Sequence, residues 1–394
     1  MIKIRLRKNL LYLLALYICS YTRKIIILII NKVFHLNAPY LFLFMMTLGE
    51  IIGGATVYIY QIITLRKKKQ VKYFGIELIY NQNQMKSVDG FFKKILLIFF
   101  AGFFDFIEFI IAVFYVPRTA KISPTIDTRL GCLSTVVGSL ICTYALQFKI
   151  GKHHKFSLII LSLCFIITLI LELFYKPEDT PFDKFLFAHF LECCYLLNVT
   201  FTDCTERYLV DFDFINPFII IMFEGIFEFI MAILYSININ PLNEITKIYE
   251  ENNTTNFIVL IFLLALYLIF SAALNAYKIY CNAIYSPMAR SLTDYFLNPF
   301  FNIYYFIWED DFDKNYFYFF ICEIISIIMD FFCCLYNEYI SLYCFGLEHD
   351  TKDSIAKRAI LVEMNPENFN INDDEEEDDN FINNIETKRT IEMS

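Results

Sequence analysis

The chain has 394 residues, of which 57% are hydrophobic and 18% aromatic, whereas ordinary soluble domains are roughly 45 to 50% apolar. Disordered, collagen-like and disulfide-scaffold classes are excluded, because apolar residues dominate and only 21 residues are Gly or Pro. The net charge is −9, but residues 350–394 hold 13 acidic against 5 basic residues. The body is therefore nearly neutral, which gives no reason to expect a nucleic-acid partner. A polytopic membrane protein remains.

Apolar stretches of about 20 residues predict membrane-spanning helices, because backbone polar groups in hydrocarbon must be satisfied within the segment. Basic residues precede the first stretch, as in a secretory signal, but no small-residue cleavage site follows, so we expect a retained span. Ten stretches qualify, namely 10–34, 39–64, 92–116, 123–146, 156–175, 185–209, 215–238, 256–279, 287–307 and 316–342. The predicted fold class is all-α, a polytopic membrane protein with ten transmembrane helices.

Loop charges predict the orientation, because short cytoplasmic loops retain Lys and Arg. With both termini cytosolic, 18 basic residues fall on the cytosolic side, the last being Arg207, Lys278 and Arg290, and 6 fall on the opposite side. Overlapping sequons at Asn252 and Asn253 lie in a loop that this topology places on the luminal or extracellular side, so both are candidate glycosylation sites. The acidic tail, 346–394, should be solvated and mostly disordered.

Cysteine and histidine residues give no sign of a metal or disulfide framework. All twelve cysteines fall within predicted spans or at their cytosolic ends, and none forms a Cys-x-x-Cys pair with histidines at zinc-like spacing. His153 and His154 lie in a basic loop, where a histidine pair is usually solvated, and His189 belongs to no motif. We therefore predict neither a cofactor nor a metal site.

The two halves of the chain share short patterns. A Glu follows an opening Pro by eleven residues in the second span, Pro39 to Glu50, and in the seventh, Pro217 to Glu228. The fourth and ninth spans both open with Ser-Pro and then an arginine, Arg129 or Arg290. Each match pairs span n with span n+5, and a five-helix repeat reverses its direction in the membrane. This predicts two inverted five-helix repeats, 10–175 and 176–345, an architecture typical of secondary transporters.

Two segments carry a family resemblance. Residues 31–47, with Asn31-Lys32 and Ala38-Pro39-Tyr40, resemble the first two helices of nucleotide-sugar and triose-phosphate translocators. Residues 205–225, from Thr205-Glu206-Arg207-Tyr208 to Glu224-Gly225, resemble the sixth-to-seventh helix region of solute carrier family 35, particularly its F subfamily. The resemblance implies the drug/metabolite transporter fold and a carrier for nucleotide-sugars. The signatures of guanine-nucleotide-sugar carriers are missing from the sequence, which argues against a GDP-sugar.

Charged residues within the spans are the candidate substrate-binding residues, because an ion in a bilayer costs roughly 2.5 to 3.5 kcal/mol at a helix centre and demands an interior position. Arg129 is the first choice for an anion, since a guanidinium binds phosphate or carboxylate through two hydrogen bonds. It is equally well explained as a helix-pairing cation for Asp127, Asp105 or Glu224. The full set is Arg129, Arg290, Glu224, Glu50, Lys32 and Asp105.

The predicted function is a secondary transporter that moves a small polar or anionic metabolite across a Golgi, endoplasmic-reticulum or endolysosomal membrane by alternating access, and not an enzyme. The expected partners are the lipid bilayer, a small-molecule substrate and, as one option, a second copy in a homodimer. Two alternatives stay open. An intramembrane transferase acting on a lipid or isoprenoid would use the acidic run 309–313 for a metal-bound diphosphate. A membrane scaffold would transport nothing.

Overall fold

The computed structural model describes residues 2–4, 10–34, 38–67, 88–115, 130–174, 181–213, 215–237, 254–284, 287–288, 316–343, 346–347, 351 and 354–355. These residues are almost entirely helical, which confirms the all-α class. A single two-stranded sheet, β1 (Ile2–Ile4) with β2 (Ile340–Leu342), is the exception among them.

Five of the described helices precede residue 176 and four follow it. The first group comprises α1 (Leu10–Phe34), α2 (Pro39–Lys67), α3 (Val88–Ile110), which continues as a π-helical turn η2 (Ile111–Tyr115), α6 (Cys132–Tyr144) and α7 (Lys152–Phe174). The second group comprises α8 (Phe182–Asp211), α9 (Pro217–Tyr235), α11 (Thr254–Ile284) and α13 (Tyr316–Tyr336).

Seven of the described helices are long and apolar enough to cross a membrane, namely α1, α2, α3 with η2, α7, α8, α9 and α11. They confirm a multi-pass membrane protein. The predicted span 123–146 is described only as the shorter apolar helix α6, and α13 covers most of the predicted span 316–342. The predicted span 287–307 lies outside the described residues, apart from Pro287 and Met288.

The start of α9 shows how local sequence sets a helix boundary. Asn216 is the N-cap, and its side-chain oxygen accepts a hydrogen bond from the backbone N of Phe218 at 2.9 Å. Pro217 occupies the first helical position, where its missing N–H costs no hydrogen bond. The Asn216 amide also donates to Gln61 Oε1 of α2 at 3.0 Å. One side chain therefore begins α9 and attaches it to α2.

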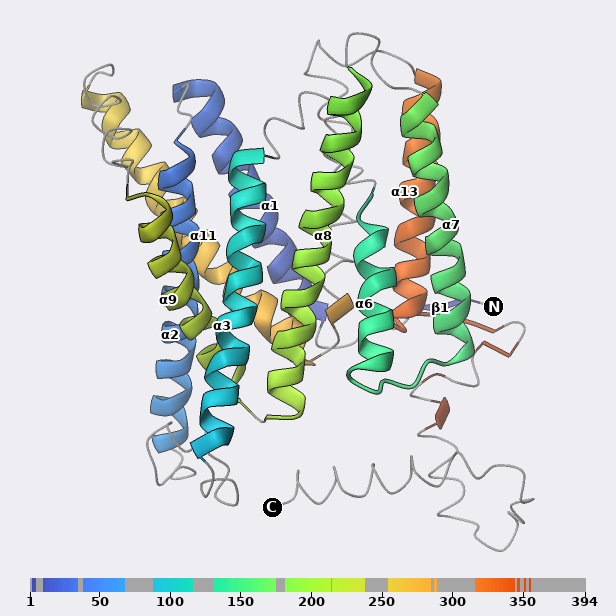
Figure 1. The fold of residues 1–394 in the computed structure, drawn as a ribbon, viewed down its shortest axis with the longest axis horizontal. Helices are drawn as coiled ribbons and strands as arrows, with labels where there is room; N and C mark the ends of the chain where they lie inside the picture. The colour runs from blue at the N-terminus through green and yellow to red at the C-terminus, as the bar shows by residue number, and fades with distance from the viewer. Residues whose placement is uncertain are drawn as a thin grey trace, which may run out of the picture.

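The helices pack in a row that runs from α2 and α9 at one end to α7 and α13 at the other (Figure 1). Helix α2 contacts α9 and α11, α1 contacts α11, and α3 contacts both α8 and α9. Helix α6 lies between α8 and α7, and α13 packs on α7. In this arrangement α11 crosses the row obliquely and also touches α8 and α9.

Glycines permit the close approach of the central helices. A Cβ on Gly53 of α2 would lie 2.3 Å from the carbonyl oxygen of Ala272 in α11. A Cβ on Gly225 of α9 would lie 2.8 Å from Glu50 Cβ and 2.9 Å from the backbone N of Ile51 in α2. Small residues at helix contacts are the usual means of close packing in membranes. Helix α2 is therefore held against α9 and α11 at backbone distance.

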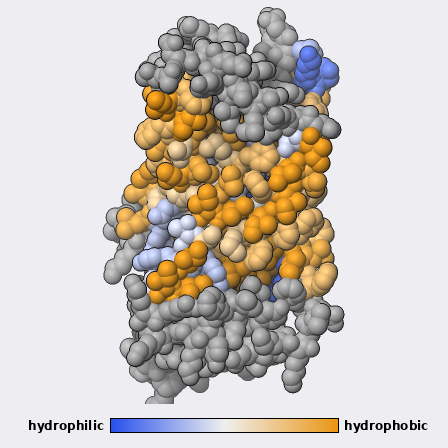
Figure 2. All heavy atoms as spheres, turned by 90° about the vertical axis from the view of Figure 1, so that its left-hand side faces the viewer, coloured by the Kyte–Doolittle hydropathy of each residue, from blue (hydrophilic) through white to orange (hydrophobic). Residues whose placement is uncertain are grey.

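Apolar side chains cover the outer face of this end of the row. Figure 2 shows a broad hydrophobic surface on the side formed by α2, α9 and α11. Exposed apolar residues of these three helices include Ile59 and Tyr60 of α2, Ile230 and Leu234 of α9, and Phe262 of α11. Large exposed apolar surfaces are rare on soluble monomers. This face therefore suits contact with lipid.

The short sheet joins the segment before α1 to the segment after α13. Strand β1 pairs antiparallel with β2, with Ile2 opposite Leu342 and Ile4 opposite Ile340. The residues before α1 therefore lie beside the segment that follows α13.

Candidate functional site

Acidic side chains from four helices converge in the interior. Glu50 comes from α2, Asp105 from α3, Glu206 from α8, and both Glu224 and Glu228 from α9; all five are at most 4% exposed. Glu50, Asp105 and Glu228 each place a carboxylate oxygen within 4.8 Å of those of the other two. Glu224 is near enough to interact electrostatically with Glu50, Asp105 and Glu206. We call these five residues the acidic cluster.

Lys278 of α11 is the cation at the centre of the cluster. Its Nζ lies 3.2 Å from Asp105 Oδ1, 3.4 Å from Asp105 Oδ2 and 3.9 Å from Glu206 Oε1. The lysine is 4% exposed, so these pairs form away from bulk water. A buried charge of this kind is stable only when it is paired and hydrogen-bonded. Lys278 therefore joins α11 to α3 and α8.

A hydrogen-bonded network continues from Glu206 toward the C-terminal ends of α8 and α11. The Asn282 amide donates to Glu206 Oε2 at 2.7 Å and to the backbone oxygen of Asp203 at 2.8 Å. Arg207 donates to the backbone oxygens of Asn282 and Ala283, and its Nε pairs with Asp211 Oδ2 at 2.7 Å. These contacts fix the relative position of the two helices and hold the Glu206 carboxyl in place.

The rest of the acidic cluster is not satisfied in this way. The carboxyl oxygens of Glu50, Glu224 and Glu228 are buried and, as carboxylates, meet no hydrogen-bond donor among the described residues; Glu50 and Glu228 can hydrogen-bond to each other only if one of them carries a proton. Two carboxylate charges 4.8 Å apart repel by about 3.5 kcal/mol at an effective dielectric constant of about 20. Lys278 supplies one positive charge. The remaining carboxyls must therefore be neutralised by protons or by a cation.

Helix α11 carries a stripe of buried polar residues past the cluster. Tyr267, Ser271, Asn275, Lys278 and Asn282 recur at intervals of four, four, three and four residues, which places them on one face of the helix. All five are at most 4% exposed. The stripe spans about 22 Å at 1.5 Å per residue. Tyr267 OH, Ser271 Oγ and Asn275 Nδ2 are buried without a well-formed hydrogen bond to the described residues, although Tyr267 and Ser271 lie close enough to interact with each other. A polar track therefore passes through an otherwise apolar bundle.

The cluster lies near the middle of the central helices. Glu50 and Glu228 each follow the first residue of their helix by eleven positions, or about 16 Å along the axis. A bilayer core is about 30 Å thick, so a residue at this depth is close to its midplane. Gly49 and Gly225 stand next to Glu50 and Glu224 in sequence. The acids therefore lie where the backbones of α2 and α9 are closest.

The structure brings together three of the sequence-predicted site residues, Glu50, Asp105 and Glu224. Lys32 lies in α1, and its side chain is outside the described part of the structure. Arg129, Arg290, Asn252 and Asn253 also lie outside the described residues, so the anion contact and the glycosylation sites stay predictions. Arg23 lies close enough to Tyr267 to interact electrostatically, which places it beside one end of the polar track.

Sequence reasoning misplaced Lys278 and left Glu206, Glu228 and Asn282 out of the site. The orientation argument counted Lys278 among cytosolic charges, and that assignment is wrong, because its side chain is buried in the acidic cluster. The spacing of Asn275, Lys278 and Asn282 within an apolar segment could have shown the error. Glu228 was visible in the repeat with Glu50, and the contact between the two acids gives that match a physical meaning.

Comparison with known proteins gives no further identification. No protein-family model matches the chain, and no curated protein matches it in sequence. The function must therefore be inferred from the geometry of the acidic cluster and of the helices that hold it.

Proposed function

We propose that the chain is a secondary transporter that moves a small polar or anionic metabolite, with nucleotide-sugars as the leading class, across an endomembrane by alternating access. Protons carried by the acidic cluster accompany the substrate. The observation that supports this proposal is the convergence of Glu50, Glu224 and Glu228, buried without a hydrogen-bond donor among the described residues, beside the Lys278–Asp105 pair. A purely structural bundle gains nothing from such groups, because each costs free energy wherever it is left unsatisfied.

Helix packing supports two inverted five-helix repeats. Matching span n with span n+5 equates α1 with α8, α2 with α9, α3 with α11 and α7 with α13. The α1–α11 contact then corresponds to the α8–α3 contact. The α2–α11 contact likewise corresponds to the α9–α3 contact, and all four contacts occur. The pairs α2–α9 and α7–α13 map onto themselves and occur as well. The proposed ten-helix architecture accounts for each of these pairings.

The same architecture gives the acidic cluster a symmetric origin. Glu50 and Glu228 occupy equivalent positions in α2 and α9, the pair of helices that maps onto itself. Such a pair contains the pseudo-twofold axis, and transporters of this type bind substrate and coupling ions where the repeats meet. The two acids therefore lie at the place from which access would alternate.

The short sheet supports both termini on one side of the membrane. Ten spans return the chain to the side on which it started, and pairing of β1 with β2 requires that the residues before α1 and after α13 meet. We assign this side to the cytosol from the basic residues that precede α1 and follow α2 in the sequence.

The charge of the cluster determines how substrate and proton are linked. Five carboxyls and one lysine repel an anion unless protons neutralise the acids first. An anionic metabolite, held through Arg129 and Arg290, should therefore travel in the same direction as protons. A cationic metabolite would compete with protons for the carboxyls and travel against them. The direction of proton flow thus reports the charge of the substrate.

The test is proton flux in liposomes that contain the purified full-length protein and a pH-sensitive dye inside. Nucleotide-sugars, nucleotides, sugar phosphates, amino acids and organic cations are added outside one at a time. We expect one class to acidify the interior, because protons enter with the substrate. Glu50→Gln should abolish the acidification, while Ser326→Ala, a change in α13 away from the cluster, should leave it intact.

Two results would contradict parts of the proposal. Proton exit upon addition of a cationic compound would retain the carrier and overturn the anionic cargo. Equal transport by wild type, Arg129→Ala and Arg290→Ala would overturn the anion site. Absence of both flux and thermal stabilisation with every class would remove the transport proposal itself, since a ligand at 100 times its Kd adds about 2.7 kcal/mol of stability.

A further inference from the structure

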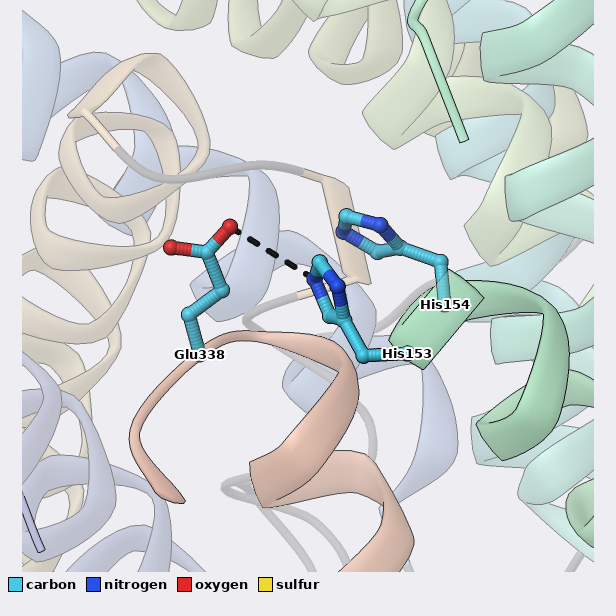
Figure 3. A group of neighbouring side chains, drawn as sticks. All are labelled: His153, His154 and Glu338. Carbon is cyan, nitrogen blue, oxygen red and sulfur yellow. Dashed lines mark ion pairs between the residues drawn. The ribbon is translucent and has the colours of Figure 1, made fainter. Parts of the chain in front are cut away.

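A second group of titratable side chains lies far from the acidic cluster, where the start of α7 meets the segment after α13. His153 and His154 are the second and third residues of α7, and Glu338 follows the end of α13 by two residues. Figure 3 shows both imidazole rings and the Glu338 carboxylate turned toward one another. His153 is 1% exposed and Glu338 is 4% exposed. The sequence-based expectation of a solvated histidine pair is therefore wrong for His153.

The spacing of these three side chains suits a metal ion. His153 Nε2 lies 3.5 Å from Glu338 Oε1, and one donor atom from each of the three residues lies within 4.8 Å of the other two. Two ligands of a tetrahedral Zn²⁺ at bond lengths of 2.0 to 2.1 Å are about 3.3 Å apart. The His153–Glu338 distance already matches this separation, and the His154 donor needs to move by at most about 1.5 Å, from 4.8 Å to 3.3 Å, to complete the set.

The bonding of His153 points to a missing partner. Neither of its ring nitrogens makes a hydrogen bond to a residue that the structure describes, although the ring is buried. Buried polar groups normally have a hydrogen-bond partner or a bound ion. Glu338 adopts φ of 58°, the left-handed conformation that commonly ends a helix, and Tyr339 N donates to Cys334 O across this turn at 2.9 Å. The turn places the Glu338 carboxylate opposite His153, so the two side chains can share a ligand.

We propose that His153, His154 and Glu338 bind a divalent transition-metal ion, with Zn²⁺ as the best match to the donor set. Two imidazoles and one carboxylate are the three protein ligands of many zinc sites, and water occupies the fourth position. Hard ions such as Mg²⁺ and Ca²⁺ prefer oxygen ligands alone and are not expected here. The proposal is independent of the transport function, which stands or falls with the acidic cluster.

Metal binding requires a change in one hydrogen bond. His154 Nδ1 accepts a hydrogen bond from the backbone N of Gly151 at 3.1 Å, so a metal would be bound through Nε2. A metal-bound imidazole carries its proton on the other nitrogen, and the Gly151 contact must then open. One neutral hydrogen bond is weak compared with a set of metal–ligand bonds, so this change does not prevent binding. It predicts faster amide hydrogen exchange at Gly151 when metal is bound.

The bound ion would connect two helices that are far apart in sequence. His153 and His154 belong to the first half of the chain and Glu338 to the second, while Tyr336 packs edge-on against His154 at 4.8 Å between ring centroids. The site lies beside β2, so it also adjoins the strand that pairs with the N-terminal residues. Metal binding should therefore stabilise the contact between α7 and α13.

The test is titration of Co²⁺ into detergent-purified full-length protein after treatment with a chelator. We expect one Co²⁺ per chain, with the intense visible bands of tetrahedral coordination, displacement by Zn²⁺ and a higher Tm with either ion. His153→Asn and Glu338→Gln should each weaken binding by more than about 100-fold, because each removes a direct ligand. Glu338→His should retain the ion, since it keeps three donors and His is tolerated in a left-handed conformation.

His189→Asn is the matched control. His189 is also a buried histidine that faces an acid, with Nε2 at 3.9 Å from Glu172 Oε2, but among the described residues no third His, Cys, Asp or Glu donor lies close enough to complete a metal site there. Its loss should leave Co²⁺ binding unchanged. Absence of Co²⁺ and Zn²⁺ binding by the wild type would overturn the proposal, and so would equal binding by His153→Asn and His189→Asn. All variants are compared by size-exclusion profile and helicity, and Glu338→His tests the site even if Glu338→Gln fails to fold.

Discussion

Polar groups are buried in two ways in this protein. In α7 and α13 the hydroxyls of Ser157 and Ser326 donate to the carbonyl four residues earlier, at 2.9 and 3.0 Å. In α11 the hydroxyl of Ser271 is equally buried but makes no well-formed hydrogen bond to a described residue, and the carboxylates of Glu50 and Glu228 meet no hydrogen-bond donor among these residues. The two serines of α7 and α13 satisfy their hydroxyls within single helices, whereas Ser271, Glu50 and Glu228 direct their polar groups into the space between helices.

The difference separates polar residues that the bilayer merely tolerates from those that a function requires. A serine bonded to its own helix can be placed anywhere in a span, because its polar group needs no partner helix. A group aimed between helices is costly unless substrate, proton or ion completes its bonding. We therefore place the proposed transport site at the α2, α3, α9 and α11 end of the row, and the proposed metal site at the margin of α7 and α13.

The largest expected effect comes from the close packing that assembles the acidic cluster. Gly53→Ala places a Cβ 2.3 Å from the carbonyl oxygen of Ala272, which is backbone and cannot rotate away. We expect α2 and α11 to separate, with a loss of about 3 kcal/mol or more, at the upper end of overpacking costs. The measurement is thermal unfolding of the detergent-purified variant.

The control for this change is Gly138→Ala in α6. A Cβ there would meet the end of the Met288 side chain at 2.5 Å and a Thr200 methyl at 3.2 Å. A methionine end can move to another rotamer, so the expected cost is below about 1 kcal/mol. Equal losses in the two variants would contradict the view that backbone contact defines the central helices.

An effect of similar size comes from the single lysine of the cluster. Lys278→Met leaves Asp105 and Glu206 buried without their cation, and breaking a buried ion pair costs about 3 to 5 kcal/mol. Adding Asp105→Asn should restore much of the stability, because the uncompensated charge is then removed. Thermal unfolding of both variants checks this.

Lys94→Met provides the comparison. Lys94 is also buried, but its Nζ donates to a neutral backbone oxygen, that of Asp213, at 3.1 Å. Loss of this hydrogen bond to a backbone oxygen should cost about 1 to 2 kcal/mol. If Lys278→Met were the milder change, the pairing seen with Asp105 would carry little energy.

Several of these features could be predicted from the sequence. The boundaries of α1, α2, α7, α8 and α9 lie within a few residues of the predicted spans, because apolar length in a bilayer leaves few alternatives. The Pro-to-Glu match also marked Glu50 and Glu228 as equivalent before any contact was known. Hydropathy and repeats therefore identified the membrane class and one pair of site residues.

The sequence did not predict which side chains of different helices pair with one another. Lys278 follows the most apolar part of α11 and reads as a cation at a membrane surface, but the oblique path of α11 brings it to Asp105. Likewise, nothing in a linear reading connects His153 with Glu338, 185 residues later. Both contacts depend on how helices cross, and hydrophobic periodicity gives the buried face of a helix without naming its neighbour.

The smallest expected effect tests the two kinds of buried serine directly. Ser326→Ala removes a hydrogen bond within α13 and should cost about 0.5 kcal/mol, the low end for an intramolecular hydrogen bond. Ser271→Ala removes a hydroxyl that makes no well-formed hydrogen bond to a described residue and keeps the Cβ that packs on Gly49, so thermal stability should stay the same or rise. Proton-linked flux should change in the opposite order, reduced by Ser271→Ala and unaffected by Ser326→Ala. If both variants lost stability and kept full flux, Ser271 would be one more structural serine and would no longer belong to the polar track along α11.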